Sequence, residues 1–436
     1  MNQTFDFIVV GAGMVGAALA NGLANHGHKV ALIDQATAPP VPAEDVPGIR
    51  VSALSVGSER YLQQLGVWSA IRAMRATPYC RLGVWEGRRR PSGPDLPLLS
   101  PRTVFNARDL GISHLGHIVE NQVTQKALWD RASEQPEIAL HTGSGVQSLS
   151  ESGQLITVTL DNDKRLTGRL LIGADGGNSR IRQLAGIGVS RSQYQQQALV
   201  ATVRYRGTPE DITWQEFHSS GPRAFLPLHT AGPFFPGESW ASLVWYDDPA
   251  VLAGLKGLSD DHFIDRVCEA FPDDLPPLTA VTDRASFPIA RQHAHHYFQG
   301  RVVLAGDAAH TINPLAGQGV NLGFQDARCL QELLDEARRQ GRDPAHSQVL
   351  ARYEARRRPD NQRMMLAMDV FYHLFSNQRL PLWAARNLGL GLARNLPFAR
   401  NQVARYAVGI DEGLPAPVRA LLDRLPGPRR DAPPSP

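Results

Sequence analysis

Three observations predict that this chain is an α/β protein built on a dinucleotide-binding domain of the Rossmann type. A short run of β-branched and aromatic residues, 5–10, leads into a glycine-rich turn and then a helical pattern. Two later apolar strands, near 170 and near 302, also end at an aspartate in a glycine-containing turn. The chain has 436 residues, whereas a typical domain has roughly 150, so the nucleotide-binding domain must be accompanied by a second unit.

Composition places the chain among globular proteins and excludes several classes of function. Hydrophobic residues make up 42% of the sequence and charged residues 20%, which suits a large core. The formal net charge of +3 is too small to indicate a nucleic-acid partner. The three cysteines, Cys80, Cys268 and Cys329, are far apart, so neither a disulfide framework nor a metal site is expected.

Residues 5–24 have the length of a membrane span but not its composition. Asp6, Asn21 and four glycines interrupt the apolar run, and no Lys or Arg precedes it as in a secretion signal. We therefore interpret the segment as strand, turn and helix. The chain is expected to stay cytoplasmic, at most peripheral on the inner face of the cytoplasmic membrane.

The turn after the first strand matches the G-x-G-x-x-G pattern of dinucleotide-binding proteins. Gly11 permits the tight turn, Gly13 lets the backbone approach a pyrophosphate, and Gly16 allows the helix to pack closely on the strand. The next strand ends at Asp34, eighteen residues past Gly16, where a carboxylate can accept both hydroxyls of an adenosine ribose. A purely structural turn is the alternative, and the pattern does not separate NAD from FAD.

A second strand-end aspartate lies far down the chain. The strand 302–305 ends at Gly306 and Asp307, and a loop rich in Pro and Gly then leads to a helix from about Gly319. If Asp34 serves the adenosine, Asp307 can serve a second polyol, which in FAD is the ribityl chain. Backbone N–H groups at the helix start would face the flavin ring with the positive end of the helix dipole. They belong to Gly317, Gln318 and Gly319. An ordinary strand-to-helix connection is the alternative.

A third strand, 170–173, ends in the same way at Asp175 and Gly176. Arg180 and Arg182 follow directly. Basic residues after an acidic turn can hold phosphates or can cap a solvated helix, and the sequence alone favours neither.

These three elements, in the order GAGMVG, GADGGNSRIR and GDAAHTINPLAGQGVNLG, resemble the single-component FAD-dependent aromatic hydroxylases, the para-hydroxybenzoate hydroxylase-like group. The segments RVSALSVGS, LGVW and VENQVTQKALW narrow the resemblance to the ubiquinone-biosynthesis hydroxylases. Within that family the chain is most similar to the members that hydroxylate 2-polyprenyl-3-methyl-6-methoxy-1,4-benzoquinol, through segments such as AMRATPYCRLGVWE and TWQEF. The resemblance covers roughly residues 5–410, and Asp34 departs from it because the family often has Glu there.

The resemblance implies an FAD site, with NAD(P)H as transient reductant and O2 as co-substrate. The ADP half of FAD would be bound by Gly11, Gly13, Gly16 and Asp34. Arg50, with Asn121 or Gln122, would contact the flavin side of the pyrophosphate and the ribityl chain. The acidic turn at Asp175 and Gly176, with Arg182 near it, would serve both FAD and pyridine nucleotide. The remaining implied cofactor residues are Gly306, Asp307, Pro314, Gly317, Gln318 and Gly319.

The implied reaction is hydroxylation of an aromatic ring through a flavin hydroperoxide, so the cofactor carries the difficult chemistry. The protein must exclude water and hold an electron-rich quinol or phenol near the flavin. We therefore expect an apolar, aromatic-lined pocket and assign no catalytic side chain, although His310 has the chemistry of a general base. The candidate pocket walls are Trp214, Phe217, Phe225, Leu226, Trp245 and Tyr246.

The same resemblance implies a Rossmann-like FAD-binding domain with an inserted β-sheet substrate domain and C-terminal helices. The FAD-binding domain is expected in three segments, 1–75, 103–187 and 288–345. The substrate domain is expected at 76–102 and 188–287, a helical region at 346–410, and a disordered tail at 411–436.

Residues 364–410 carry five arginines and one acid among many Leu residues, three Phe and one Trp. Such a segment can lie on an anionic membrane surface, bind other ubiquinone-biosynthesis proteins, or form a plain helical layer over the core. The segment 229–239 reads as a lengthened loop between two strands of the substrate domain.

Other functions remain open at the level of sequence. A sister hydroxylase of the same pathway would act on a polyprenylphenol, and a more distant one on a soluble phenol. From other classes, a flavin dehydrogenase or a non-catalytic FAD-binding scaffold would need the same cofactor site. The ring position, the prenyl length and the oligomeric state are not encoded in any motif of the chain.

Overall fold

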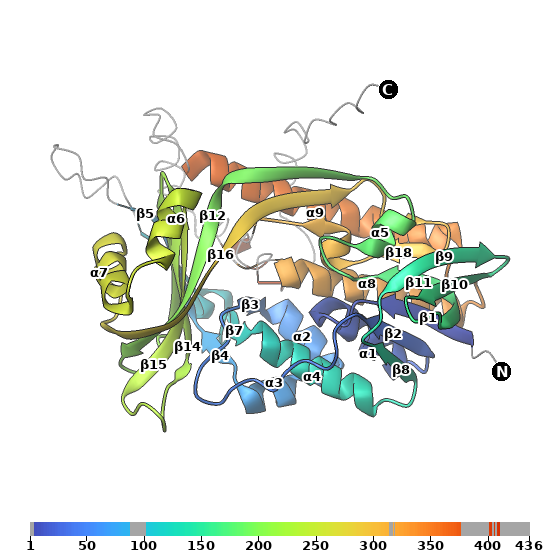
Figure 1. Ribbon diagram of the computed structural model, residues 1–436, viewed down its shortest axis with the longest axis horizontal. Coiled ribbons are helices and arrows are strands. Elements are labelled where there is room, and N and C mark those ends of the chain that lie inside the picture. Colours follow the sequence, from blue (N-terminus) through green and yellow to red (C-terminus); the bar gives the residue numbers. More distant parts are fainter. Residues whose placement is uncertain are drawn as a thin grey trace.

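The computed structural model of the protein describes residues 4–87, 102–313, 317, 319–375, 401–402, 405 and 408–409. The strands in these ranges form two eight-stranded sheets and one three-stranded sheet. Figure 1 shows the two large sheets at opposite ends of the molecule, with helix α9 (Ser347–Phe375) running along both.

The first sheet has a parallel centre with the strand order β17-β18-β11-β1-β2-β8. Strands β2, β1, β11 and β18 are parallel to their neighbours, so their carboxyl ends meet at one edge. The glycine turn and all three strand-end aspartates follow these strands and are therefore gathered at that edge. The strands are β1 (Thr4–Val10), β2 (Val30–Asp34), β8 (Ile138–Thr142), β9 (Val146–Ser152), β10 (Leu155–Leu160), β11 (Arg165–Gly173), β17 (Phe298–Gln299) and β18 (Val302–Leu304).

Small residues let the first helix, α1 (Met14–Asn25), pack against both α4 (Asn121–Glu134) and α8 (Gly319–Arg339). Every residue of α1 from Gly16 to Ala24 is buried. Its one polar side chain there, Asn21, donates to the Leu128 carbonyl of α4 at 2.9 Å, so the buried amide is satisfied.

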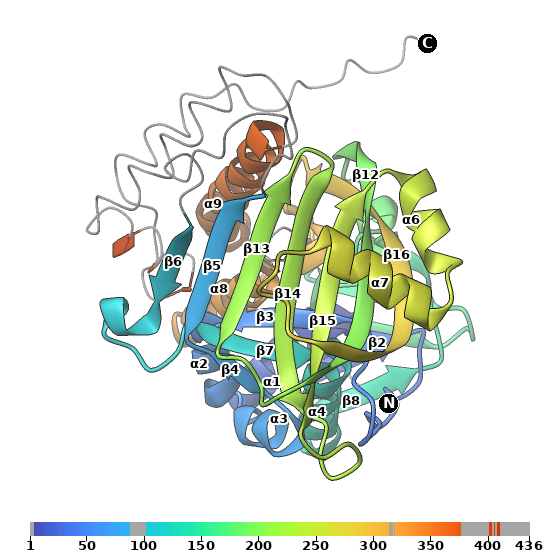
Figure 2. The same ribbon diagram turned by 90° about the vertical axis from the view of Figure 1, so that its left-hand side faces the viewer.

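The second sheet is almost entirely antiparallel, in the order β19-β16-β12-β15-β14-β13-β5-β6. Figure 2 shows α6 (Pro249–Lys256) and α7 (Asp260–Ala270) across one face, with α8 and α9 on the other side. Its strands are β5 (Arg81–Glu86), β6 (Thr103–Asn106), β12 (Val189–Arg206), β13 (Ile212–His218), β14 (Gly221–Thr230), β15 (Glu238–Asp247), β16 (Leu278–Ala294) and β19 (His310–Thr311).

The third sheet, β3-β7-β4, lies beside helices α2 (Val56–Gln64) and α3 (Trp68–Met74) (Figure 1). In it β7 (Gly116–Glu120) pairs with β3 (Val51–Ser55) and β4 (Thr77–Tyr79). Val51 pairs with Glu120, so the chain entering β3 and the chain leaving β7 are side by side. The remaining short elements are α5 (Arg180–Leu184), a 3-10 turn at Ala107–Leu110 and another at Gly306–Ala308.

Two strands of the second sheet extend past the domain boundaries expected from the sequence. Strand β6 begins at Thr103 and belongs to the second sheet, one residue beyond the expected end of the segment at 102. Strand β16 stays in that sheet to Ala294, past the expected boundary at 287. The helical region is helix α9 up to Phe375, while residues 376–400 and the tail 411–436 lie outside the described ranges. Among the residues that the structure describes, no helix has both the length and the apolarity that crossing a bilayer requires.

A buried polar network ties the turn after β18 to α8 and α9. Asp326 of α8 accepts from the Gly306 N–H at 3.1 Å and from His310 Nε2 at 2.5 Å. Its other carboxylate oxygen accepts from Arg357 of α9 at 2.7 Å. Burial alone raises the pKa of the Asp326 carboxyl, but His310 and Arg357 outweigh burial and hold that pKa below its usual value. Asp326 is therefore an ionised carboxylate, and it supports the turn that carries Asp307.

His293 of β16 adjoins this network, and its Nε2 lies 2.9 Å from the Tyr297 hydroxyl. Burial, reinforced by the nearby His310 and Arg358, lowers the pKa of the His293 imidazole to about 3. A histidine that folds in the neutral form binds fewer protons than it does in the unfolded chain, where its pKa is about 6.5.

We expect acidification from pH 7 to pH 5 to destabilise the protein through His293. The unfolded state gains protons below about pH 6.5 and the folded state does not, so the free energy of unfolding falls by up to about 1.4 kcal/mol per pH unit from this residue. His293→Gln should remove that part of the slope in denaturant titrations at several pH values. The exposed His262, changed to Gln, is the control and should leave the slope unchanged. Equal slopes for His293→Gln and the parent protein would contradict this assignment.

Candidate cofactor-binding site

The three glycines of the first turn have separate structural roles. Gly11 has φ +103°, and a Cβ there would lie 2.3 Å from the Ala174 carbonyl oxygen. A Cβ on Gly16 would lie 1.9 Å from the Gly11 carbonyl oxygen. A Cβ on Gly13 would meet no protein atom within 4 Å. Two of the glycines are therefore required by packing, whereas Gly13 leaves open space at the start of α1 for an incoming pyrophosphate.

Asp34, at the end of β2, lies against the same turn. Its Oδ2 accepts from the Ala12 N–H at 2.6 Å, and its Oδ1 accepts from the Ala36 N–H at 2.8 Å. These bonds orient a half-exposed carboxylate at the place predicted for the adenosine ribose. Gln125 of α4, which the sequence analysis missed, donates to the Ala12 carbonyl at 3.4 Å and so also borders the turn.

The acidic turn after β11 organises the short helix α5. Asp175 accepts from the Ser179 hydroxyl at 2.5 Å and from the Ile181 N–H at 3.1 Å. The Ser179 hydroxyl in turn accepts from the Arg182 N–H, as an N-cap does. Gly176 has φ +79°, and no protein atom lies within 4 Å of a Cβ built there.

Arg182 lies near the acidic turn, as the resemblance implies, but its guanidinium is turned into the protein. Arg182 is only 1% exposed, and its guanidinium donates to the Ala308 carbonyl at 2.7 Å and the Gly177 carbonyl at 3.0 Å. It therefore ties the turn after β11 to the turn after β18. Gln292 of β16 makes a parallel link that the sequence analysis missed, donating to the Gly177 carbonyl at 2.7 Å and the Asp307 carbonyl at 3.0 Å.

Asp307 is accessible to solvent, although protein atoms lie near its carboxyl on several sides. Burial among neighbouring atoms raises the pKa of its carboxyl, and the nearby His310 and Arg50 act in the opposite direction. A solvent-accessible carboxyl with protein on several sides is the environment expected of a residue that borders a binding cleft. The structure thus brings Arg50 close to Asp307, although 257 positions separate them in the sequence.

Arg50 and Asn121 meet because β3 and β7 pair. The Asn121 N–H donates to the Arg50 carbonyl at 2.9 Å, and the Asn121 side chain accepts from the Ser52 hydroxyl at 2.6 Å. Gln122 lies next to Gly48, where an added Cβ would approach its side chain to 3.2 Å. The Arg50 guanidinium lies 5.8 Å from the centre of the Phe287 ring of the second sheet. This group therefore lies between the third sheet and strand β16 of the second sheet.

The amino end of α8 faces the same region. Gly317 has φ +64°, and a Cβ there would lie 3.3 Å from the Ala53 nitrogen of β3. Gly319 begins α8, and a Cβ there would meet no protein atom within 4 Å. Asn321, missed by the sequence analysis, locks the helix to β3 by accepting from the Ser55 N–H at 3.0 Å and donating to the Ala53 carbonyl at 2.9 Å. The predicted contributions of Pro314 and Gln318 lie outside the described residues.

The six candidate pocket residues divide between the two faces of the second sheet, so they do not all border one pocket. Trp214, Phe225 and Trp245 face α6 and α7, where they pack in the outer core with Phe263 and Phe271. The Trp214 and Phe225 rings are stacked with centroids 5.6 Å apart. Strand residues alternate between faces, so these three side chains belong to the outer core.

Phe217 and Tyr246 point to the opposite, inner face, together with Ala198, Ile289 and Met368 of α9. Leu226 follows Phe225 in β14 and therefore also points inward, where it is only half-buried. The Tyr246 hydroxyl lies 3.4 Å from Asn313 Oδ1, next to the turn that carries Asp307. The inner face thus borders the cofactor region.

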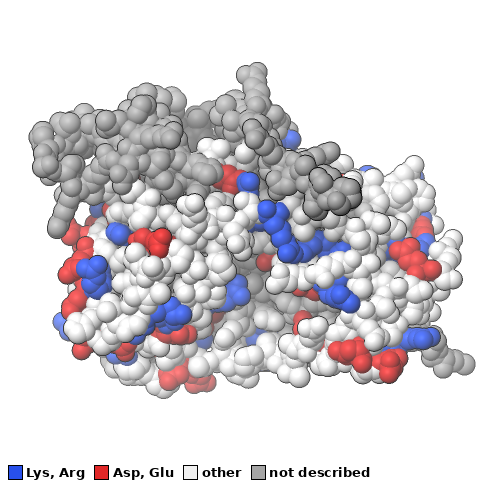
Figure 3. Space-filling model, turned by 45° about the horizontal axis from the view of Figure 1, so that its top comes forward, with Lys and Arg blue, Asp and Glu red and all other residues white. Residues whose placement is uncertain are grey.

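These observations fit a flavin dinucleotide. The open position at Gly13 and the oriented Asp34 suit the ADP half, and Asp307 offers a second acidic contact for a polyol. The start of α8 presents a positive helix end beyond it. Figure 3 shows Lys and Arg side chains gathered beside a hollow near the middle of one face. The fold and the site therefore define an FAD-binding protein of the Rossmann class.

Comparison with known proteins narrows this class. The family model described as "FAD binding domain" matches residues 4–367. The 3-demethoxyubiquinol 3-hydroxylase of Escherichia coli is 42% identical over 94% of this chain and 100% of its own length. The ubiquinone hydroxylase of Rhodospirillum rubrum is 32% identical, over 96% of this chain and 93% of its own. The chain belongs to this FAD-binding family of hydroxylases, as the sequence motifs predicted.

Solved structures agree on the fold. The p-nitrophenol 4-monooxygenase of Pseudomonas putida superposes with a TM-score of 0.72 at 16% identity, covering 94% of this chain and 97% of that one. A probable FAD-dependent monooxygenase of Pseudomonas aeruginosa gives a TM-score of 0.70 at 21% identity, covering 89% of this chain and all of that one. The predicted para-hydroxybenzoate hydroxylase-like architecture is confirmed.

A matched pair of glycine substitutions should separate binding from folding. Gly13→Val puts its side chain into open space, so the apoprotein should keep its free energy of unfolding within about 0.5 kcal/mol while FAD affinity falls at least about tenfold. Gly16→Ala should lower both, because its Cβ would clash with the Gly11 carbonyl. Flavin fluorescence titration and denaturant unfolding measure the two effects. Unchanged FAD affinity in Gly13→Val would contradict the location of the pyrophosphate.

Proposed function

We propose that this protein hydroxylates the ring of a polyprenylated benzoquinol in ubiquinone biosynthesis, using FAD, O2 and a reductant of the NAD(P)H type. The main support for the proposal is the partly exposed apolar inner face of the second sheet, which lies directly beside the candidate FAD site. The names of the Escherichia coli and Rhodospirillum rubrum relatives supply the substrate class. FAD, once reduced, activates O2 as an electrophile that a closed-shell ring can accept.

The residues of this chain would bind FAD and orient it. The glycine turn and Asp34 would hold the ADP half, while Asp307 and the Asn121 group would hold the ribityl region. The positive end of α8 would favour negative charge on the pyrimidine side of the reduced ring. Because Asp326 fixes the Gly306 N–H at 3.1 Å, it acts as a positioning residue for the turn that carries Asp307.

Water exclusion would fall to the inner face of the second sheet. Its apolar side chains include Leu226, Val244 and Phe287, which are only half-buried, whereas the outer face is closed by α6 and α7. Apolar groups left partly uncovered between two domains are suited to an aromatic, lipid-tailed substrate. Met368 of α9 packs against this face, so the helix closes it from the other side.

The reductant must also reach the flavin. The basic side chains beside the hollow in Figure 3 suit a ligand with a pyrophosphate. Association with the inner leaflet of a membrane, or with other ubiquinone-biosynthesis proteins, would bring a prenylated substrate within reach. That association depends on residues 364–410, most of which lie outside the described ranges, and it stays a prediction.

The proposed reaction is tested by the fate of oxygen. Purified holoprotein given NAD(P)H, a short-chain prenylated methoxybenzoquinol and isotopically labelled O2 should yield a product carrying one labelled oxygen by mass spectrometry. A flavin dehydrogenase would oxidise NAD(P)H without labelling the ring, and an FAD-binding scaffold would not oxidise it at all. A soluble phenol that reacts as well as the prenylated ring would point to a different substrate class.

The inner-face assignment is tested with two phenylalanines from neighbouring strands. Phe217→Leu should loosen the substrate wall, so NAD(P)H oxidation without hydroxylated product should rise at least about twofold. Phe225→Leu, on the outer face, should destabilise the fold by about 1 to 3 kcal/mol and leave coupling unchanged. The ratio of hydrogen peroxide to hydroxylated product measures coupling. Equal ratios in the two variants would contradict the placement of Phe217 in the substrate pocket.

A further inference from the structure

Three side chains with metal-binding atoms meet where α2 packs against β7. They are Glu59 of α2, His117 of β7 and His114 just before β7. Their candidate ligand atoms all lie within 4.8 Å of one another. His114 Nε2 is 2.7 Å, and His117 Nδ1 is 3.3 Å, from the same oxygen, Glu59 Oε2. We propose that this His–Glu cluster binds one Zn²⁺ ion, a function separate from the hydroxylation.

His117 is a buried donor directed at the same carboxylate. Its side chain is only 9% exposed, and its Nδ1 lies 3.3 Å from Glu59 Oε2. A metal ion between the two would accept the nitrogen lone pair and balance the carboxylate charge together.

The spacing suits tetrahedral zinc. With metal–ligand bonds of about 2.0 to 2.1 Å, ligand atoms lie about 3.3 Å apart. The His117–Glu59 separation of 3.3 Å already has this value, and His114 must move back by about 0.6 Å. Two imidazoles and one carboxylate form a donor set that zinc proteins use, with water completing the fourth position.

Outer contacts orient the donors as metal sites require. Gln63 Nε2 donates to Glu59 Oε1 at 3.0 Å, which leaves Oε2 facing the two imidazoles. The Ser113 hydroxyl lies 2.8 Å from His114 Nδ1, so it can accept that N–H and leave Nε2 free for the metal. The edge of Trp68 packs on the His117 ring at 4.9 Å between centroids, which fixes the ring plane.

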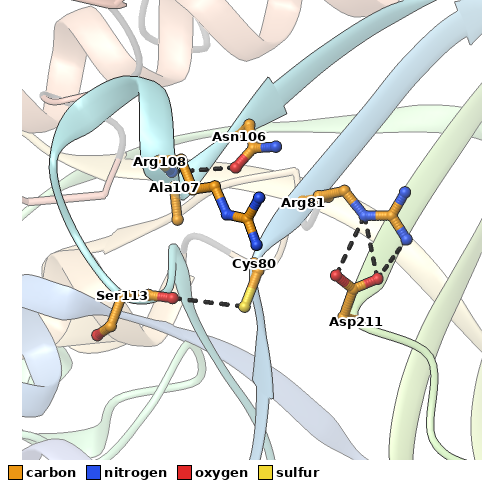
Figure 4. Close-up of a pocket in the computed structure, with 7 residues that line it drawn as sticks. All are labelled: Cys80, Arg81, Asn106, Ala107, Arg108, Ser113 and Asp211. Carbon is orange, nitrogen blue, oxygen red and sulfur yellow. Dashed lines mark hydrogen bonds and ion pairs between the residues drawn. The ribbon is translucent and has the colours of Figure 1, made fainter.

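One member of the cluster, His114, is accessible to solvent. Ser113 also lines a surface cavity of about 300 Å³, shown in Figure 4 with Cys80, Arg108 and four other residues. His114, bonded to Ser113, has 21% of its side chain exposed. Solvent and a hydrated ion therefore have access to the side of the cluster that carries His114.

The chain contains a second group of two histidines and a carboxylate that serves as a contrast. His26 and His28 contact different oxygens of Asp335. Arg338 Nη1 lies 3.4 Å from His28 Nδ1, and this fixed positive charge opposes a cation. A general affinity of histidines for metal would appear at both groups, whereas the proposed site would be confined to the His–Glu cluster.

The test is zinc binding by FAD-loaded protein stripped of metal with a chelator. Competition with a chromophoric chelator should give one Zn²⁺ per chain with a Kd of about 1 µM or tighter. Glu59→Gln and His117→Gln should weaken binding at least about 100-fold, and Ser113→Ala about tenfold. His28→Gln is the control and should bind as the parent does. Added Zn²⁺ should raise the Tm only where the cluster is intact, because the ion would join α2 to β7.

Flavin content reports whether each variant is folded, so loss of zinc with retained FAD supports the site. A parent protein that binds zinc no tighter than about 100 µM would overturn the proposal. So would Glu59→Gln and His117→Gln variants that keep FAD and bind zinc like the parent. A simultaneous loss of zinc in His28→Gln would show that binding is not confined to this cluster and would overturn it as well.

Discussion

The cofactor region depends on one constraint, the parallel alignment of β2, β1, β11 and β18. Parallel strands bring their carboxyl ends to a common edge, so turns from residues 11, 34, 175 and 307 converge there. Backbone N–H groups donate to the carboxylates of Asp34 and Asp175. Two side chains, Arg182 and Gln292, tie the turn after β11 to the turn after β18 through backbone carbonyls.

The second constraint is the two-residue period of the other sheet. Its outer face is covered by α6 and α7 with closely packed aromatic rings. The inner face can then remain partly uncovered toward α8 and α9 without loss of the fold. Helix α9 is tied to this sheet by Asp369, which contacts both Arg291 and Tyr194. The cofactor edge and the apolar face are thus held in fixed relation by one long helix.

Motifs with an internal geometric reason were predicted correctly from sequence. The glycine turn was recognisable because close packing at Gly11 and Gly16 admits only glycine. The sequence motifs also pointed to the family, which the comparisons confirm. The roles of Arg182, Asn321 and Gln292 were not predicted, because each bonds to backbone atoms of distant segments and leaves no local pattern. We expected no metal site because the cysteines are far apart in the sequence. The His–Glu cluster instead joins Glu59 to two histidines more than fifty positions away.

The sequence by itself determined the class of fold, the family and the strand-end aspartates, because strand periodicity, glycine positions and acidic turns are local properties that neighbouring residues express together. Only the tertiary structure decided which face of the second sheet each aromatic residue occupies. The sequence of an aromatic-rich strand does not say which of its two faces the helices will cover. The tertiary structure also decided that the buried Arg182 links two turns and that Arg50 lies near Asp307. Those outcomes depend on long-range strand pairing, which no single segment of the chain encodes.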